Sequence, residues 1–326
     1  MPSTLDEQLT KYLTDVHSIE AQALAQLRAA PKIAGDDELA RVFSEHLEET
    51  EDQERRVRER LEARSASPSK VKDVVAWVGG AGMIVFAKAN PDTPGKLTAH
   101  AFSYEHMELA AYDLLANVAE RAGDQETVEV ARSIREQESA MAERLAANFD
   151  RAVEASLRDV GSDDIGEQLV KYLADAHAIE AQAIQLLEKG PAIAGESDLA
   201  KVFSDHLEET RSQQAAVEAR LEAHGAGPSA LQDALMRVGA LNMGAFFGAQ
   251  PDTPAKLAGF AFAFEHLEIA GYELLKRVAA RAGEQETVRV AERIIAEEHA
   301  AAASIRAQFD AAMTASLEAQ EVAVHR

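Results

Sequence analysis

The stretch Val42–Thr50 reads VFSEHLEET, and the stretch Val202–Thr210 reads VFSDHLEET. The two stretches lie 160 residues apart, and the same shift aligns the two halves of the chain without a gap. It also pairs KYLTDVHSIEAQA, which begins at Lys11, with KYLADAHAIEAQA, which begins at Lys171. Two long copies indicate a duplicated domain rather than a solenoid of short repeats.

The duplication predicts two domains, 1–160 and 161–326, which meet in a short polar segment. The composition is 47% hydrophobic but only 5% aromatic, which is typical of packed helices whose seams are filled by small and aliphatic side chains. The formal net charge is −23. Because an acidic surface repels phosphate backbones, nucleic-acid binding is not expected.

The chain contains no cysteine, which excludes disulfides, zinc–thiolate sites and thiol chemistry. Its N-terminal stretch, MPSTLDEQL, lacks the basic region and the apolar run of a signal peptide. The longest apolar stretches, 74–87 and 235–249, contain glycine and are shorter than the roughly 20 residues that span a bilayer. We therefore expect a cytoplasmic location and no contact with a membrane.

Hydrophobic residues recur at helical spacing, and no strand-like alternation is present, so the sequence predicts an all-α fold. Each half is expected to form a bundle of four main helices, with an extra short helix between the second and third. This extra helix is apolar and is suited either to cap the bundle or to form the interface of a homo-oligomer. Pro94 follows Thr93 at the expected start of the third main helix. In the first half the predicted helices are 5–29, 37–63, 71–87 (the extra helix), 93–123 and 125–157.

The apolar stripe of each main helix is interrupted near its middle by acidic residues or a histidine. Five carboxylates and one histidine per half are thereby predicted to converge, and no Lys or Arg on the stripes neutralises them. Burying unpaired charges costs several kcal/mol, so cations are needed, and two divalent ions per bundle nearly balance the charge. Glutamate and histidine ligands without cysteine suit iron or manganese. The candidate metal ligands are Glu20, His46, Glu49, Glu105, Glu108 and Glu138, with Glu180, His206, Glu209, Glu265, Glu268 and Glu298 in the second half.

The duplication also sorts the ten histidines. Six form pairs in register, of which His46 and His206 are candidate ligands. The pairs His17/His177 and His106/His266 remain open, either as ligands or as supporting residues. The four without a counterpart are set aside as site candidates: His100, His224, His299 and His325.

Tyr112 and Tyr272 lie one helical turn after Glu108 and Glu268. Each is expected to hydrogen-bond a metal ligand, to pass an electron, or to pack as an ordinary amphipathic ring. Gln53 lies on the same seam and is interpreted as a residue that supports the ligands.

Three segments carry a resemblance to a known family: HLEETEDQ at His46, LRAAPKIAGDDELARVF at Leu27 and EHMELAAYDLL at Glu105. Both halves resemble the YciE/YciF-like ferritin-like proteins, the DUF892 group. The resemblance implies a ferritin-like bundle of bacterial origin that is associated with stress responses. It also implies kinship with di-metal proteins such as ferritins, rubrerythrins and manganese catalases.

Carried over by position, Glu20 resembles the terminal carboxylate of the first helix, and Glu49 resembles the bridging carboxylate of the second. Glu105 and Glu108 resemble a Glu-x-x-Glu pair, and Glu138 resembles the carboxylate of the fourth helix. Two features depart from the usual pattern: the order on the second helix is His-x-x-Glu, and no histidine follows Glu138 by three or four residues.

These features predict a di-metal oxidoreductase that handles peroxide or dioxygen. The alternatives are a metal-binding stress protein without turnover and a polar core that binds no metal. If the carboxylates repel one another without metal, replacing Glu49 by Gln is expected to stabilise the metal-free bundle.

Overall fold

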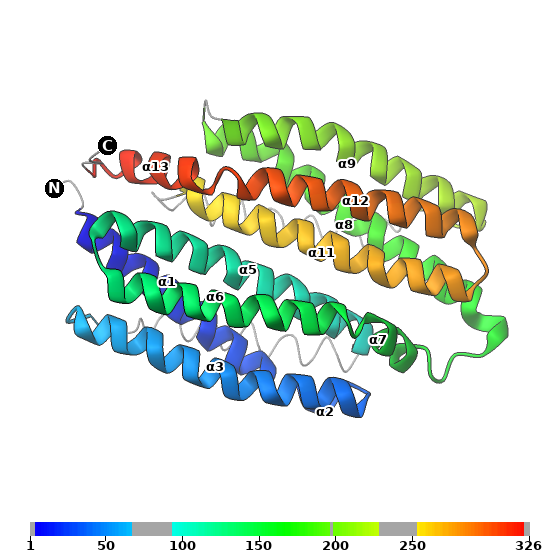
Figure 1. Cartoon of the computed structure of the whole chain (residues 1–326). Helices are drawn as coiled ribbons and strands as arrows, with labels where there is room; N and C mark the ends of the chain where they lie inside the picture. The colour runs from blue at the N-terminus through cyan, green and yellow to red at the C-terminus, as the bar shows by residue number, and fades with distance from the viewer. Residues whose placement is uncertain (1–3, 67–92, 196–197, 228–252, 323–326) are drawn as a thin grey trace. The chain divides into compact units, whose positions relative to one another are not determined.

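A computed structural model describes residues 4–66, 93–195, 198–227 and 253–322 (Figure 1). The described residues are helices, turns and short connections without a β-strand, so the predicted all-α fold with two tandem domains is confirmed. One compact unit comprises residues 1–158 together with 317–326, and the other comprises residues 159–316. The exact domain boundary at 160/161 stays a prediction. The expected extra helix, 71–87, and its counterpart lie outside the described residues.

The first unit is built on four long helices that lie side by side in Figure 1. Around the bundle, α1 contacts α3 and α5, and α6 contacts the same two helices, so the α1/α5 seam lies opposite the α3/α6 seam. The helices are α1 (Leu5–Leu27), α2 (Ala30–Ile33), α3 (Asp37–Ala63), α5 (Thr93–Ala122), α6 (Gln125–Ala146) and α7 (Phe149–Ser156).

The second unit repeats this arrangement. Here α8 contacts α9 and α11, and α12 contacts the same two helices. The elements are η1 (Ser162–Asp164), α8 (Ile165–Ala194), α9 (Asp198–Ala223), α11 (Thr253–Arg281), α12 (Gln285–Arg306) and α13 (Phe309–Ala319).

Local sequence signals explain where the helices begin and end. Thr4 and Glu7 form a reciprocal capping box at the start of α1, with N–H···O distances of 3.2 and 2.8 Å. The Asp36 carboxylate accepts the backbone N–H groups of Glu38 and Leu39 and so begins α3. Gly123, with φ of +75°, ends α5 in the left-handed conformation that glycine adopts without strain.

The predicted fourth helix, 125–157, is interrupted in the structure. The Asn148 side chain donates a hydrogen bond of 2.8 Å to the Arg144 carbonyl, and its backbone N–H bonds to Leu145 rather than one residue earlier. An asparagine that bonds its own helix in this way competes with the helical ladder. The chain therefore turns between α6 and α7. After the turn, Ser156 Oγ accepts the Gly95 N–H at 2.8 Å and satisfies a donor in the first turn of α5.

The predicted first helix, 5–29, likewise ends at Leu27 and is followed by the short α2. Buried aliphatic side chains such as Leu9, Leu13 and Leu115 fill the seams between the long helices. At mid-height the apolar core gives way to buried carboxylates and histidine, where the two candidate sites lie.

Candidate metal centres

Each unit gathers one histidine and three glutamates from three of its long helices. In each group, every residue offers one ligand atom, and these atoms all lie within 4.8 Å of one another. All eight side chains are buried. The first cluster consists of His46 from α3, Glu105 and Glu108 from α5, and Glu138 from α6; the second consists of His206, Glu265, Glu268 and Glu298.

The His46 ring lies at the centre of the first cluster. Its Nε2 atom is 3.2 Å from Glu105 Oε2 and 3.6 Å from Glu138 Oε2. Burial acts to lower the pKa of His46, but the Glu105 and Glu49 carboxylates outweigh it and raise the pKa to about 9. Without metal, the ring is therefore an imidazolium at neutral pH and supplies positive charge to the carboxylates around it.

Burial removes the Glu108 carboxylate from water, and no nearby group donates a hydrogen bond in place of the lost water. It is 1% exposed, and neither carboxylate oxygen has a hydrogen-bond partner. Burial, followed by the charges of Glu20 and Glu105, raises the pKa of Glu108 well above its usual value. Glu138 also has two buried oxygens without a hydrogen bond. Buried acceptors that lack donors fit a site for cations, because a cation would satisfy their lone pairs.

Glu20 reaches the first cluster from α1. It has no exposed surface, and Tyr112 from α5 donates a hydrogen bond to its Oε1 atom. Burial raises the pKa of Glu20 to about 8, even though the Tyr112 hydrogen bond and the His46 charge act in the opposite direction. Tyr272 donates to Glu180 Oε1 in the second unit. Of the roles expected for these tyrosines, the structure therefore supports a hydrogen bond to a candidate ligand.

Glu49 lies at the edge of the first cluster rather than among its close ligand atoms. Its Oε2 atom is 3.1 Å from His46 Nδ1 and 2.5 Å from Arg144 Nη2 on α6, and its side chain is 37% exposed. The hydrogen bond from His46, with the Arg144 ion pair, lowers the pKa of Glu49 to about 2. The expectation that no Arg neutralises the candidate ligands is thus wrong for Glu49. Arg144 lies outside the α6 stripe, but its long side chain reaches across to α3.

Glu209 has a different environment from Glu49. It accepts a hydrogen bond of 3.2 Å from His206 Nδ1, and its side chain is 59% exposed. The residue at the position of Arg144 is Ser304, whose hydroxyl donates to the Ala300 carbonyl of its own helix. The two units therefore share their buried clusters but differ at this edge.

Three of the four histidines left open by the sequence contact groups outside the clusters. His17 Nε2 lies 2.8 Å from Glu54 Oε1, and His106 Nδ1 donates to the Phe102 carbonyl at 2.8 Å. In the second unit His266 makes the same contact with Phe262 at 2.7 Å. These contacts hold the rings on the flanks of their helices.

Gln213 contacts a candidate ligand directly, since its Nε2 atom donates to Glu298 Oε1 at 2.6 Å. The corresponding Gln53 donates to Gln137, at 3.4 Å. The glutamines thus support the second cluster more closely than the first.

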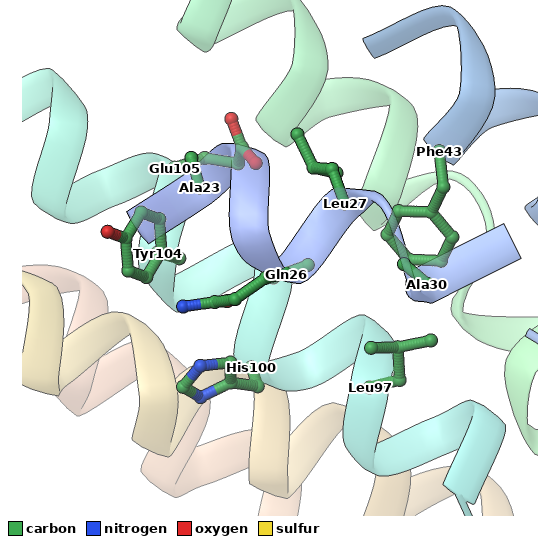
Figure 2. A pocket seen from close by; sticks show the side chains of 10 residues that line it. Ala23, Gln26, Leu27, Ala30, Phe43, Leu97, His100, Tyr104 and Glu105 are labelled. Atoms are coloured by element: carbon green, nitrogen blue, oxygen red, sulfur yellow. The ribbon is translucent and has the colours of Figure 1, made fainter. Parts of the chain in front are cut away.

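The structure also places His100, which has no histidine counterpart in the second half, near the first cluster. His100, Gln26 and Tyr104 line a small pocket that also reaches Glu105 of the first cluster (Figure 2). His100 corresponds to Phe260 in the second half, so the repeat does not identify it as a site residue. The missed signal is that this part of the first unit is polar where the second unit is apolar.

In a comparison with known proteins, both halves of the chain match the same family. Residues 4–158 and 164–318 each match the model of a domain of unknown function, DUF892. The chain belongs to the DUF892 family. The resemblance seen in its sequence is therefore confirmed.

Within this family, the chain is similar to Protein YciF of Escherichia coli (strain K12). The two are 28% identical over 141 residues, which are 42% of this chain and 85% of YciF. No solved structure matches the chain. Among the helices described, none is long and apolar enough to cross a membrane.

Proposed function

We propose that each unit of this DUF892 protein binds two divalent metal ions, iron or manganese, at its buried cluster. The observation that carries the proposal is the set of buried carboxylate oxygens without hydrogen-bond donors, above all both oxygens of Glu108 and of Glu268. A structural polar core would pair these atoms with protein donors. A site built for cations leaves them for the ion.

Charge balance supports two ions per unit. The four fully buried carboxylates of the first unit carry four negative charges when ionised, and two divalent cations carry four positive charges. Metal binding then replaces the protons that His46 and the carboxylates hold in its absence, so protons are released on binding. The buried glutamates that would hold the ions are Glu20, Glu105, Glu108 and Glu138, together with His46; the counterparts are Glu180, Glu265, Glu268, Glu298 and His206. The partly exposed Glu49 and Glu209 would join from the edge.

We further propose an oxidoreductase function in a stress response, with peroxide or dioxygen as the substrate. Iron or manganese, when bound, supplies the redox chemistry. The protein's own contribution is to exclude water by burial and to fix Glu20 through the Tyr112 hydroxyl. The small pocket beside Glu105 has room for about one water molecule.

A metal-binding protein without turnover is the second candidate. It is favoured by the burial of the clusters, because Glu20 and Glu138 have no exposed surface and a reactant larger than a few atoms does not reach them. Metal-loaded protein that consumes neither peroxide nor dioxygen would select this candidate.

Elemental analysis of protein purified without added metal, and again after reconstitution with Fe(II) or Mn(II), tests the proposal. We expect up to four ions per chain. The double variant Glu108→Gln, Glu268→Gln should lose most of them, whereas the exposed pair Glu62→Gln, Glu222→Gln should retain them. A reconstituted wild-type protein with metal in neither unit would refute metal binding.

A further inference from the structure

The first unit has a pocket on the α1/α5 seam that ends at its metal-candidate cluster. It leaves about 20 Å³ for the centre of a water-sized molecule, which is enough for one water. Gln26 and His100 are half-buried, whereas Glu105 at the inner end of the pocket is 3% exposed. We call this the His100 pocket. Figure 2 shows the Gln26, His100 and Tyr104 side chains gathered on one side of it, with Leu27 and Leu97 on the other.

The second unit has apolar residues at the same three positions. Leu186, Phe260 and Phe264 stand where the first unit has Gln26, His100 and Tyr104. Leu186 and Phe264 are buried, at 9% and 5% exposure. The inner residue, a glutamate, is the same in both units. The polar character of the route to that glutamate is therefore particular to the first unit.

The opposite seam shows the reverse difference. In the first unit the Arg144 guanidinium on α6 binds Glu49 on α3 and cancels the negative charge of this carboxylate at the α3/α6 seam. In the second unit Ser304 replaces the arginine, and Glu209 is 59% exposed while it contacts His206. A carboxylate at the surface that also touches a cluster residue offers a cation its first contact.

We propose that the two clusters take up a divalent cation through opposite seams: the first through the His100 pocket, and the second past Glu209 at the α9/α12 seam. This inference rests on the metal-binding function proposed above. It predicts that two sites with the same buried ligands load at rates set by different residues.

The chemistry of a hydrated cation explains why polarity decides the route. A divalent ion with its full shell of waters does not fit a space for one water, so it must exchange waters for protein ligands as it enters. The Gln26 carbonyl oxygen and a neutral His100 nitrogen can replace waters on the way to Glu105. Burial lowers the pKa of His100, so a nitrogen lone pair is available at neutral pH. The phenyl rings of Phe260 and Phe264 offer no such ligand. At the other seam of the first unit, Arg144 cancels the charge of Glu49 that would attract a cation.

Uptake kinetics in full-length proteins with a single working cluster test the proposal. Glu268→Gln with Glu298→Gln disables the second cluster, so that Co(II), whose visible absorption changes on coordination, reports the first cluster alone. In this protein His100→Phe should slow Co(II) uptake about ten-fold, which corresponds to about 1.4 kcal/mol in the barrier. The equilibrium affinity should stay within about two-fold, because His100 lies outside the cluster. His100→Gln, which keeps a polar group, should restore most of the rate.

A second variant should restore the rate of Co(II) uptake, which would not happen if His100 had only a structural role. Arg144→Ser removes the positive charge that neutralises Glu49 at the α3/α6 seam, and it should restore fast uptake to the His100→Phe protein. In the reciprocal protein, where Glu108→Gln with Glu138→Gln disables the first cluster, Ser304→Arg should slow uptake. Phe260→His should leave that rate unchanged, because the second cluster loads from the other side.

The outcomes separate this inference from the function on which it rests. If both single-cluster proteins bind Co(II) at equilibrium but His100→Phe and Ser304→Arg leave the rates unchanged, the separate routes are refuted while metal binding stands. If neither protein binds Co(II), metal binding itself is refuted, and the routes with it. Helical circular dichroism of each variant verifies that the bundles are folded.

Discussion

Glu20 offers the most quantitative test of how the buried carboxylates affect the fold. It has no exposed surface, and burial raises its pKa from 4.5 to about 8 in the metal-free protein. Below about pH 4.5 the carboxyl is protonated in the folded and unfolded chains alike, and it carries no penalty. As the pH rises, the unfolded chain loses this proton while the folded chain keeps it, so stability falls until the pH passes about 8. Glu20→Gln keeps the side chain neutral in both states and removes this loss.

The size of the effect follows from the distance between the pH and the unfolded pKa. Each pH unit is worth about 1.4 kcal/mol, so the penalty at pH 7, which lies about 2.5 units above the unfolded value, is about 3 kcal/mol. At pH 6 it is about 2 kcal/mol and at pH 8 about 4 kcal/mol. The Tyr112 hydroxyl can donate to the amide oxygen of Gln as it does to Glu20, so that hydrogen bond persists. The variant should therefore exceed wild type in stability by these amounts.

Urea unfolding of chelator-treated protein at pH 6, 7 and 8 measures the difference. Glu62→Gln, at an exposed position on α3, serves as a control for a lost carboxylate outside the cluster. A stability gap between Glu20→Gln and wild type that stays constant across these pH values would refute the reasoning. It would mean that Glu20 is ionised in the folded protein at pH 6. With Mn(II) added, wild type should gain more stability than the variant, because metal binding to the folded state stabilises by mass action.

Two further predictions concern residues at the edges of the bundles. Glu49→Gln should destabilise the metal-free protein by about 1 kcal/mol at pH 7, since the ion pair between Glu49 and Arg144 is partly exposed and screened. Glu209→Gln should change stability by less than about 0.5 kcal/mol. Urea unfolding of both variants without metal measures these changes, and a gain in stability for Glu49→Gln would restore the expectation that the carboxylates repel one another. Asp124→Ala should lower the free energy of unfolding by about 1–2 kcal/mol, because Asp124 caps α6 through the Thr127 N–H and binds Arg60 at 2.9 Å. The number of metal ions bound per chain should not change. A fall in this number together with stability would contradict a purely structural role.

Much of the fold could be predicted from the sequence because its signals are local and repeated. The second helix was predicted at 37–63 and α3 spans Asp37–Ala63, since Asp36 is a strong N-cap and the apolar period is regular. The break after α6 could not be predicted in the same way. It depends on whether the Asn148 side chain turns back to the Arg144 carbonyl or out to solvent, and both are compatible with the hydrophobic pattern.

The sequence likewise predicts part of the candidate site but not all of it. Interruptions of an apolar stripe identify residues that point into the bundle, and the structure brings His46, Glu105, Glu108 and Glu138 together. The stripe does not fix how far a long side chain from a neighbouring face reaches. Arg144 illustrates this, since it lies off the stripe yet binds Glu49. The assignment of Glu49 and Glu209 as ligands stays a prediction, and their exposure makes it the part that metal analysis tests most directly.

The duplication has a further consequence for how the two clusters behave. A pattern search that requires matching residues in both halves finds the buried ligands, but it discards every feature by which the halves differ. Those differences lie around the clusters: Arg144 corresponds to Ser304 in the second half, and His100 corresponds to Phe260. Because Coulomb interactions extend over several ångströms in a partly buried setting, a positive charge at Arg144 lowers the cation affinity of the first cluster without touching its ligands. A metal titration of the whole chain should therefore resolve two classes of site, and Arg144→Ser should bring them together. The same measurement on a protein with identical, independent clusters would give one class before and after the substitution.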